Sequence, residues 1–412
     1  MSKQFRPHRK TLELLQSGPI GAHLESFAAL FVQQRYSRQA GWRKIRLVAD
    51  LSQWMLQKHF GLKELDEQRT TKFLRWRWKR IVRQGGDQCT LAVLLRHLRE
   101  KDIIPPPAVP TLRPIDLIER DYGRFLRQER GFMSASVGQY LPVARRFLWH
   151  QFRDRKIRLN ELRTKDVTGF VLKDASNRGR RSAQLMTSVL RSFLTYLFQE
   201  GRTAVNLAMA IPATAGGRLS ELPRYLEAAQ VEKLLGCCDR RQKVGRRDYA
   251  ILLLLARLGL RAGEVVRLNL EDIEWTAGEL LIHGKGNRID RLPLLEDVGK
   301  ALADYLKRGR PSCSTRRVFV QSKAPYAGLA DPPVAISGMV SRALARAGLT
   351  PLNRGAHLLR HSLATTLLRG GASLAQIGQV LRHQHTQTTE IYAKVDLNAL
   401  RALAQPWPGG AQ

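Results

Sequence analysis

A His, an Arg, a second His and a Tyr follow one another near the C-terminus of the chain. His357 and Arg360 are three residues apart, so on a helix they lie one turn apart on one face and can reach the same small anion. His383 and Tyr392 follow, nine residues apart across a Thr-rich break. Taken alone, such a motif is more often an exposed helix face followed by a core tyrosine. Cations and imidazoles around a single phenol nevertheless favour chemistry on a phosphate.

Two cations upstream extend this group. Arg261 follows a Gly break at the start of a helix, and Glu264, three residues later, can hold its guanidinium. Lys285 lies in the segment Gly284–Asn287, whose two glycines predict a tight hairpin turn. By themselves these residues would be a helix boundary with a salt bridge and an exposed turn lysine. With the C-terminal group, they become candidates for one phosphate-directed site.

Positive charge is spread along the whole chain. The 412 residues carry a formal net charge of +34, of which residues 1–110 contribute +12, residues 111–220 +11 and residues 221–412 +11. Charge kept for solubility alone would rarely reach this magnitude. A long polyanion that runs past every domain is the simplest partner, because neutralising its phosphates releases counterions.

Cysteine content and hydropathy narrow the class of protein. The four Cys form no CxxC pair and have no nearby His at metal spacing, which argues against zinc and for a reducing compartment. We find no signal peptide and no apolar run of about 18 residues, so we expect a cytoplasmic protein without a membrane segment. The apolar run Ile251–Ala256 predicts a buried helix.

Proline-rich and glycine-rich segments divide the chain into three parts. Residues 1–110 and 115–203 have helical periodicity, and the prolines between them are typical of a stiff linker. Residues 204–224 form a second linker. Residues 225–405 begin with two helices, continue with three strands and are mostly helical after Val298. The strands are expected at Asp272–Trp275, Glu279–His283 and Arg288–Leu294. The fold class is therefore mainly α with a small antiparallel β-sheet.

The first two helical blocks look like copies of one another. Their apolar positions match at an offset that drifts from 96 to 99 residues, as loop insertions between matched helices would produce. Any two amphipathic bundles align to some degree, but we favour a duplication in which residues 1–110 copy the 115–203 domain. The matched pairs are Tyr36 with Phe132, Leu47 with Val143, Leu51 with Phe147, Leu62 with Leu159, Leu65 with Leu162, Phe73 with Phe170, Leu91 with Leu190, Leu94 with Phe193 and Leu98 with Leu197.

The motifs GLRxxE, GKGNR and HLLRHS, with a Tyr nine residues after the last His, resemble the tyrosine recombinase (phage integrase) family of DNA breaking and rejoining enzymes. The resemblance covers residues 225–400 and extends to 115–201, which is similar to the family's helical core-binding domain. It implies an α+β catalytic domain and double-stranded DNA as partner. The six expected active-site residues are Arg261, Lys285, His357, Arg360, His383 and Tyr392.

The resemblance also implies a role for each residue. Tyr392 is the nucleophile, and it keeps the phosphate as a 3′-phosphotyrosyl ester. Arg261 and Arg360 present planar forks to the non-bridging oxygens. His357 is the candidate base for a phenol whose ordinary pKa is about 10.

The two remaining residues act on other oxygens. His383 would bond a non-bridging oxygen, and Lys285 would protonate the departing 5′-oxygen. This chemistry implies no metal ion and no other cofactor.

Arg382 departs from the family's pattern, which usually has Gly before the last active-site His. A positive φ at this position would strain an Arg. We expect a helical position instead, with Arg382 adding a phosphate contact.

The function implied is that of a site-specific recombinase of a mobile element or phage, which exchanges strands within a tetramer of protomers. Two alternatives stay open: a DNA-binding accessory protein that only organises a synapse, and a type IB topoisomerase-like enzyme that acts alone. The six intact residues favour a catalyst. The apolar positions of Leu397–Leu403, after the nucleophile, favour packing on a neighbouring protomer.

The assignment of Lys285 gives the first testable prediction. Lys285→Ala should slow cleavage by roughly 10²–10⁴-fold with little change in DNA binding, because an alkoxide leaves poorly without a proton. A substrate with sulfur at the 5′-bridging position needs no proton, so cleavage by this variant should return nearly to the parent rate. Arg261→Ala should stay slow on the same substrate. Equal rescue of both variants would show that the lysine only positions phosphate.

Overall fold

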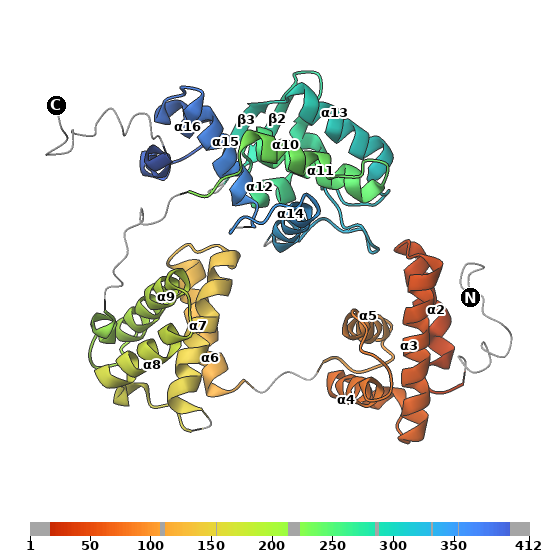
Figure 1. Ribbon diagram of the computed structural model, residues 1–412. Helices are drawn as coiled ribbons and strands as arrows, with labels where there is room; N and C mark the ends of the chain where they lie inside the picture. The colour runs from red at the N-terminus through yellow and green to blue at the C-terminus, as the bar shows by residue number, and fades with distance from the viewer. Residues whose placement is uncertain are drawn as a thin grey trace, which may run out of the picture. The chain divides into compact units, whose positions relative to one another are not determined.

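The computed structural model describes residues 17–107, 112–153, 155–212, 223–284, 288–330, 333–352 and 354–395. The described chain is mostly helical and holds one three-stranded antiparallel sheet (Figure 1). Each of its three parts, here called the N-terminal, central and C-terminal blocks, has a hydrophobic core of its own. None of the described helices is both long enough and apolar enough to cross a membrane.

Over its described residues, 17–107, the N-terminal block is a bundle of four α-helices and two 3-10 turns. Its longest helix begins after Ser37, whose side chain accepts a hydrogen bond from the amide of Ala40 at 3.3 Å. The α-helix after that begins after Asp66, whose carboxylate accepts a hydrogen bond from the amide of Arg69 at 2.7 Å. The core is rich in aromatic side chains. The elements are η2 (Gly21–His23), α2 (Leu24–Gln33), α3 (Arg38–Gln57), η3 (Leu62–Glu64), α4 (Glu67–Trp78) and α5 (Asp87–Glu100).

The central block has the same succession of helices, followed by one more 3-10 turn. Its first helix begins at Pro114, a position that proline suits because the amide there has no helical partner. Tyr122, Phe147 and Phe193 are fully buried in its core. The elements are α6 (Pro114–Gln128), α7 (Ser134–Phe152), η4 (Leu159–Glu161), α8 (Thr164–Ser176), α9 (Arg180–Gln199) and η5 (Leu207–Ala210).

The two helical blocks agree in their internal packing. In each, the second helix contacts the first, third and fourth helices, and the third helix packs on the fourth. A 3-10 turn joins the second helix to the third in both. The nine residue pairs matched by sequence also have matching environments. Seven of the nine pairs are buried on both sides. The other two, Tyr36 with Phe132 and Leu62 with Leu159, are partly buried against their cores.

The C-terminal block contains the sheet, whose three strands lie close to the expected positions. Leu280 and Ile282 face the core from the middle strand, and the register pairs Leu280 with Leu292. The strands are β1 (Ile273–Glu274), β2 (Glu279–His283) and β3 (Ile289–Pro293). The turn residues 285–287, and Lys285 with them, lie outside the described residues.

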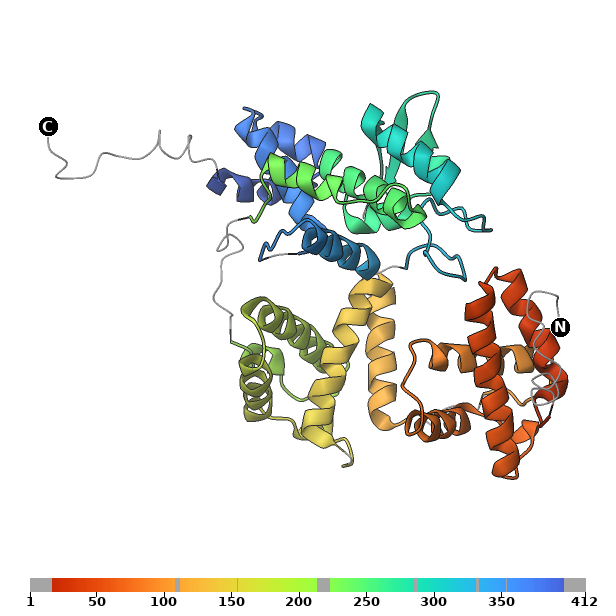
Figure 2. The same cartoon turned by 45° about the vertical axis from the view of Figure 1, so that its right-hand side comes forward.

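Helices surround this sheet and build most of the block. The core helix α11 carries the apolar run Ile251–Ala256, which is buried as expected, and it packs against α10, α13 and α15 (Figures 1 and 2). Between η7 and α14 the chain makes loops with two isolated bridges instead of helix. The helical elements are α10 (Ala228–Gly236), α11 (Lys243–Arg257), α12 (Ala262–Arg267), η6 (Leu270–Asp272), α13 (Glu296–Asp304), η7 (Tyr305–Gly309), α14 (Val334–Arg346), α15 (His357–Arg369), α16 (Leu374–Val380), η8 (Thr386–Thr388) and η9 (Glu390–Val395).

Candidate active site

The turn between α11 and α12 sets the position of Arg261. Gly259 in this turn has φ +58, and a Cβ built on it would lie 2.7 Å from the side chain of Leu381. Glycine is therefore required both for the backbone conformation and for the close approach of the residue that follows α16. Arg261 is the N-cap residue of α12, as the Gly break predicts.

Glu264 fixes the guanidinium of Arg261. Its carboxylate accepts hydrogen bonds from Arg261 Nη1 at 2.8 Å and from the Arg261 backbone amide at 2.9 Å, so the sequence-based pairing is confirmed. The Glu264 side chain is only 2% exposed, whereas that of Arg261 is 38% exposed. Burial acts to raise the pKa of Glu264, but Arg382 and Arg261 outweigh it and the pKa is lowered. Glu264 thus stays an anion that holds Arg261 at the surface.

Arg360 is more buried than Arg261, and its guanidinium connects three segments of the chain. It sits on α15 and donates hydrogen bonds to the backbone carbonyls of Gly259 and Leu381. Burial, aided by the charges of Arg261 and Arg382, lowers the pKa of Arg360 to about 9, so it is still a cation at neutral pH. The carbonyl bonds satisfy donors that would otherwise be buried without partners.

Tyr392 is held in η9 with its phenol against α15. Its side chain is buried with Ala364, Ile377 and Leu381. Its Oη makes a hydrogen bond of 2.9 Å with Nδ1 of His361. Burial raises the pKa of Tyr392 to about 12, although Arg360 and Arg261 act in the opposite direction. The phenol is therefore close enough to both arginines to interact with their positive charges.

His361 was not among the residues selected from the sequence. Burial, with the charges of His357 and Arg360, lowers the pKa of His361 to about 4, so its ring is neutral at pH 7. A neutral imidazole can take a proton from the phenol that it contacts. The available signal was its place in the HLLRHS motif, directly after Arg360 and one turn after His357. His357 itself begins α15 with an exposed side chain.

His383 lies between α16 and η8, inside the same region. Its Nδ1 makes a hydrogen bond of 2.7 Å with Oγ1 of Thr389, a residue of the Thr-rich break. Burial, followed by the charges of Arg360 and Arg261, lowers the pKa of His383 to about 4. The neutral ring is fixed in orientation by the threonine.

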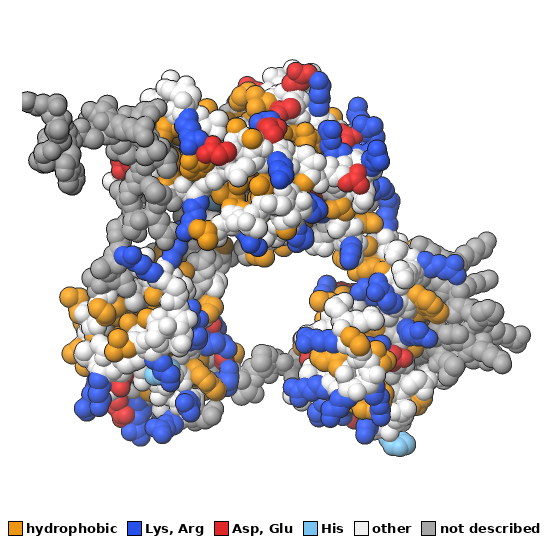
Figure 3. Space-filling view, viewed as in Figure 1, with side chains coloured by type: hydrophobic (Ala, Val, Ile, Leu, Met, Phe, Trp, Pro, Cys, Tyr) orange, Lys and Arg blue, Asp and Glu red, His pale blue; other side chains and the backbone are white. Residues whose placement is uncertain are grey.

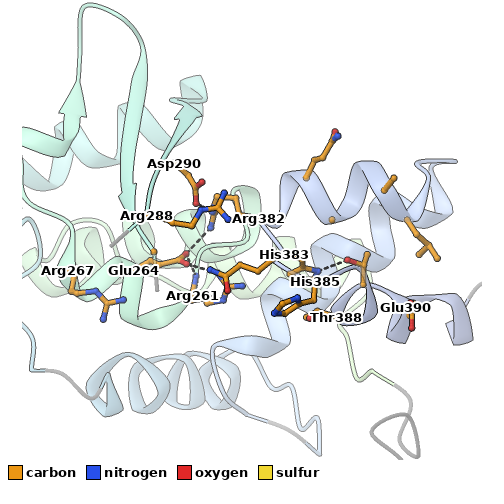
Figure 4. Close-up of a pocket in the computed structure, with 17 residues that line it drawn as sticks. Arg261, Glu264, Arg267, Arg288, Asp290, Arg382, His383, His385, Thr388 and Glu390 are labelled. Atoms are coloured by element: carbon orange, nitrogen blue, oxygen red, sulfur yellow. Dashed lines mark hydrogen bonds and ion pairs between the residues drawn. The ribbon is translucent and has the colours of Figure 1, made fainter. Parts of the chain in front are cut away.

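Arg382 does not occupy the position expected for it. Its φ is +54, so it is not helical, and its side chain is only 7% exposed. Nη2 donates to Oε2 of Glu264 at 2.8 Å (Figure 4). The expectation that Arg382 is helical is therefore wrong, whereas the phosphate contact expected of it stays a prediction. The guanidinium turns inward because a buried carboxylate attracts it more strongly than solvent does.

A pocket of about 890 Å³ opens beside these residues. Its walls come from α12, from the base of the β2–β3 hairpin, from α16 and from η8, and Figure 4 shows Arg261, Arg382 and His383 converging on it. Four arginines and three carboxylates are among the lining residues, and this positive excess suits an anionic ligand. Two of the six candidates, Arg261 and His383, line the pocket, and Arg360 and Tyr392 lie close enough to interact electrostatically with them or with each other.

Comparisons with known proteins agree with this constellation. The phage integrase family matches residues 224–398. Over 397 residues the chain is 42% identical to y4rA of Sinorhizobium fredii, which carries an integrase/recombinase name, and the match covers 96% of each chain. It is 31% identical over 289 residues to the tyrosine recombinase XerD of Listeria monocytogenes, covering 68% of this chain and 94% of XerD.

The chain belongs to the phage integrase family. It is a tyrosine recombinase, an enzyme that transfers DNA strands. The fold agrees: the structure of XerH bound to a palindromic difH substrate, a post-cleavage complex, superimposes with a TM-score of 0.55 at 20% identity. That match covers 83% of this chain and 97% of XerH.

The contact between His361 and Tyr392 in this recombinase yields a prediction. If His361 takes the phenolic proton, His361→Asn should slow single-turnover cleavage by about 10²–10⁴-fold, since Asn can bond the phenol but cannot accept its proton. DNA affinity should be unchanged, which gel shifts at fixed salt would measure.

His357→Asn is the matched variant on the same helix. If His357→Asn cleaves slowly while His361→Asn cleaves at the parent rate, the base is His357, as the sequence resemblance implies.

Proposed function

We propose that this tyrosine recombinase is a site-specific DNA recombinase of a mobile element or phage, which cuts one strand with Tyr392 and keeps it as a 3′-phosphotyrosyl ester. The observation that carries the proposal is the hydrogen bond of Tyr392 Oη to an imidazole, beside two guanidiniums that act on its pKa. A phenol needs both a proton acceptor and a nearby positive field to act as a nucleophile at neutral pH.

Attack by Oη on the scissile phosphorus forms the phosphotyrosyl bond and breaks the bond to the 5′-oxygen. Arg261, which is exposed on the pocket wall, and Arg360 behind it would stabilise the negative charge on the non-bridging oxygens. The phenolic proton passes to an imidazole, and the 5′-oxygen takes a proton from Lys285. The reverse attack by a 5′-hydroxyl of another strand restores the phosphodiester, so the energy of the bond is conserved.

Double-stranded DNA is the proposed substrate, and its contacts extend beyond the pocket. Lys and Arg side chains are numerous on the visible surface of each block (Figure 3). Structures with the same fold include XerH bound to difH and lambda integrase bound to a COC′ core site. A tetramer of protomers on two synapsed sites is proposed for strand exchange. The segment Leu397–Leu403 that would join neighbours lies outside the described residues.

The N-terminal block is proposed to be a second core-binding domain. Its packing pattern and its buried positions match those of the central block. Its surface carries two exposed arginines that stack on half-buried indoles, with Arg80 4.2 Å from the ring centre of Trp76 and Arg83 4.5 Å from that of Trp78. Both arginines follow the end of α4 and are held by indoles of that helix, and cations placed in this way suit contacts to a phosphate backbone.

The nucleophile is tested by Tyr392→Phe. The variant keeps the ring and its packing but loses the attacking oxygen, so it should bind DNA with parent affinity and never become attached to it. Trapping on a nicked suicide duplex that carries an end of the element provides the measurement. An adduct that survives denaturant in this variant would place the nucleophile elsewhere.

The role of the N-terminal block is tested by deleting residues 1–110. Because the central and C-terminal blocks have separate cores, the remaining chain should fold, shorten its footprint and show a flatter dependence of log Kd on log salt. An unchanged slope together with lost oligomerisation would instead indicate a protein interface.

Point variants in the full chain separate the effect of losing positive charge from the effect of losing a folded block. Exchanging Arg80 and Arg83 for Gln should also flatten the slope, by about one unit for each phosphate that the protein no longer neutralises. Arg99→Gln is the control in the same block, because both ends of its guanidinium are already bonded to Glu67 at 2.7 and 3.0 Å.

A further inference from the structure

Arg382 combines a left-handed backbone with an almost completely buried cation. Its φ of +54 is disfavoured for any side chain with a Cβ, so the position is conformationally costly. The surrounding contacts must outweigh this cost for the residue to stay there. The contact in question is the ion pair with Glu264, whose side chain is 2% exposed.

Glu264 distributes its two oxygens between two arginines. Oε1 faces Arg261 Nη1 at 2.8 Å, and Oε2 faces Arg382 Nη2 at 2.8 Å. A buried carboxylate needs more than one partner to offset the loss of water. With Oε2 shared between Arg382 Nη2 and the Arg261 backbone amide, the guanidinium of Arg261 is bonded to Glu264 through Nη1 alone, and Arg261 lines the pocket.

Arg382 also reaches toward the hairpin. Its Nε and Nη1 are buried without a hydrogen-bond partner among the described residues, and Nε lies 3.7 Å from Oδ2 of Asp290 on β3. The side chain thus lies between α12 and the strand that follows Lys285, while its backbone leads directly into His383. The Arg382 guanidinium thus lies where α12, the β2–β3 hairpin and the segment of His383 meet, and each of these carries a candidate residue (Figure 4).

We propose that Arg382 is a positioning residue that acts through Glu264 to hold Arg261 at the scissile phosphate, an inference that rests on the proposed function. In this role Arg382 acts on Glu264 and not on DNA, because its Nη2 donates to the buried Glu264 carboxylate at 2.8 Å. Without Arg382, Glu264 draws Arg261 into a closer pairing and away from the pocket. Removing Arg382 therefore lowers the rate of cleavage and leaves the affinity for DNA unchanged.

The test is a double-mutant cycle between Arg382 and Arg261, measured as single-turnover cleavage of a nicked duplex that carries an end of the element. Arg382→Gln should slow cleavage by about 10²-fold, the scale for a misplaced catalytic group, with Kd changed less than about twofold. In an Arg261→Ala background the same exchange should cause no further slowing.

Two companion variants separate positioning from general damage. Arg382→Lys should recover part of the rate, since an ammonium can still reach Glu264. Arg382→Gly relieves the backbone strain but removes the ion pair, so it should be slow even where its melting temperature equals that of the parent.

Arg257→Gln is the matched control. Arg257 pairs with Glu232 at 2.8 Å and with Asp297 at 3.1 Å on the same block but does not line the pocket, so its exchange should leave cleavage intact.

Three results would overturn the proposal: equal slowing by Arg382→Gln with and without Arg261, parent-rate cleavage by Arg382→Gly, or a loss of DNA affinity that matches the loss of rate. Each of these leaves the proposed function standing as long as the parent forms its Tyr392 adduct. If the parent forms no adduct, the proposed function itself fails.

Discussion

The buried guanidinium of Arg360 is the interaction on which the site depends. It joins α15 to the carbonyl of Gly259, before α12, and to that of Leu381, after α16. These three segments are far apart in sequence, and two of them lead directly into Arg261 and His383. A cation with two fixed carbonyl acceptors can occupy one orientation, so the segments hold one register with respect to each other. The candidate active site is thus assembled by a residue that is also proposed to act in its chemistry.

Burying several guanidiniums together requires a compensating anion, and Glu264 supplies it. Burial lowers the pKa of Arg360 and of Arg382, and the nearby charge of Arg261 lowers both further. Like charges at this distance would repel strongly in a medium of low dielectric constant. One carboxylate placed between two of them reduces the repulsion while leaving the exposed face of Arg261 positive. The site keeps an attraction for phosphate without losing its folded arrangement.

Much of this architecture could be predicted from the sequence. The three strands, the buried helix α11 and the Arg261–Glu264 pair follow from periodicity and from spacing within one helical turn. Such signals are local, because they depend on residues a few positions apart. The partner of Tyr392 and the direction of Arg382 depend on contacts across 31 and 118 residues, which no local pattern encodes. Sequence reasoning therefore identified the region correctly but chose the wrong environment for Arg382.

The burial of Tyr392 affects both the access of DNA to its phenol and the pKa of that phenol. Its side chain is 1% exposed, and burial is the largest influence on its pKa, which is raised to about 12. The proposed attack of Tyr392 on duplex DNA requires its phenol to become accessible, and greater access to water places the hydroxyl in a more polar surrounding. The burial penalty then falls while Arg360, fixed by its carbonyl bonds, stays in place. Exposure of the phenol to water would therefore lower the pKa of Tyr392 toward its ordinary value, because burial is the influence that raises it.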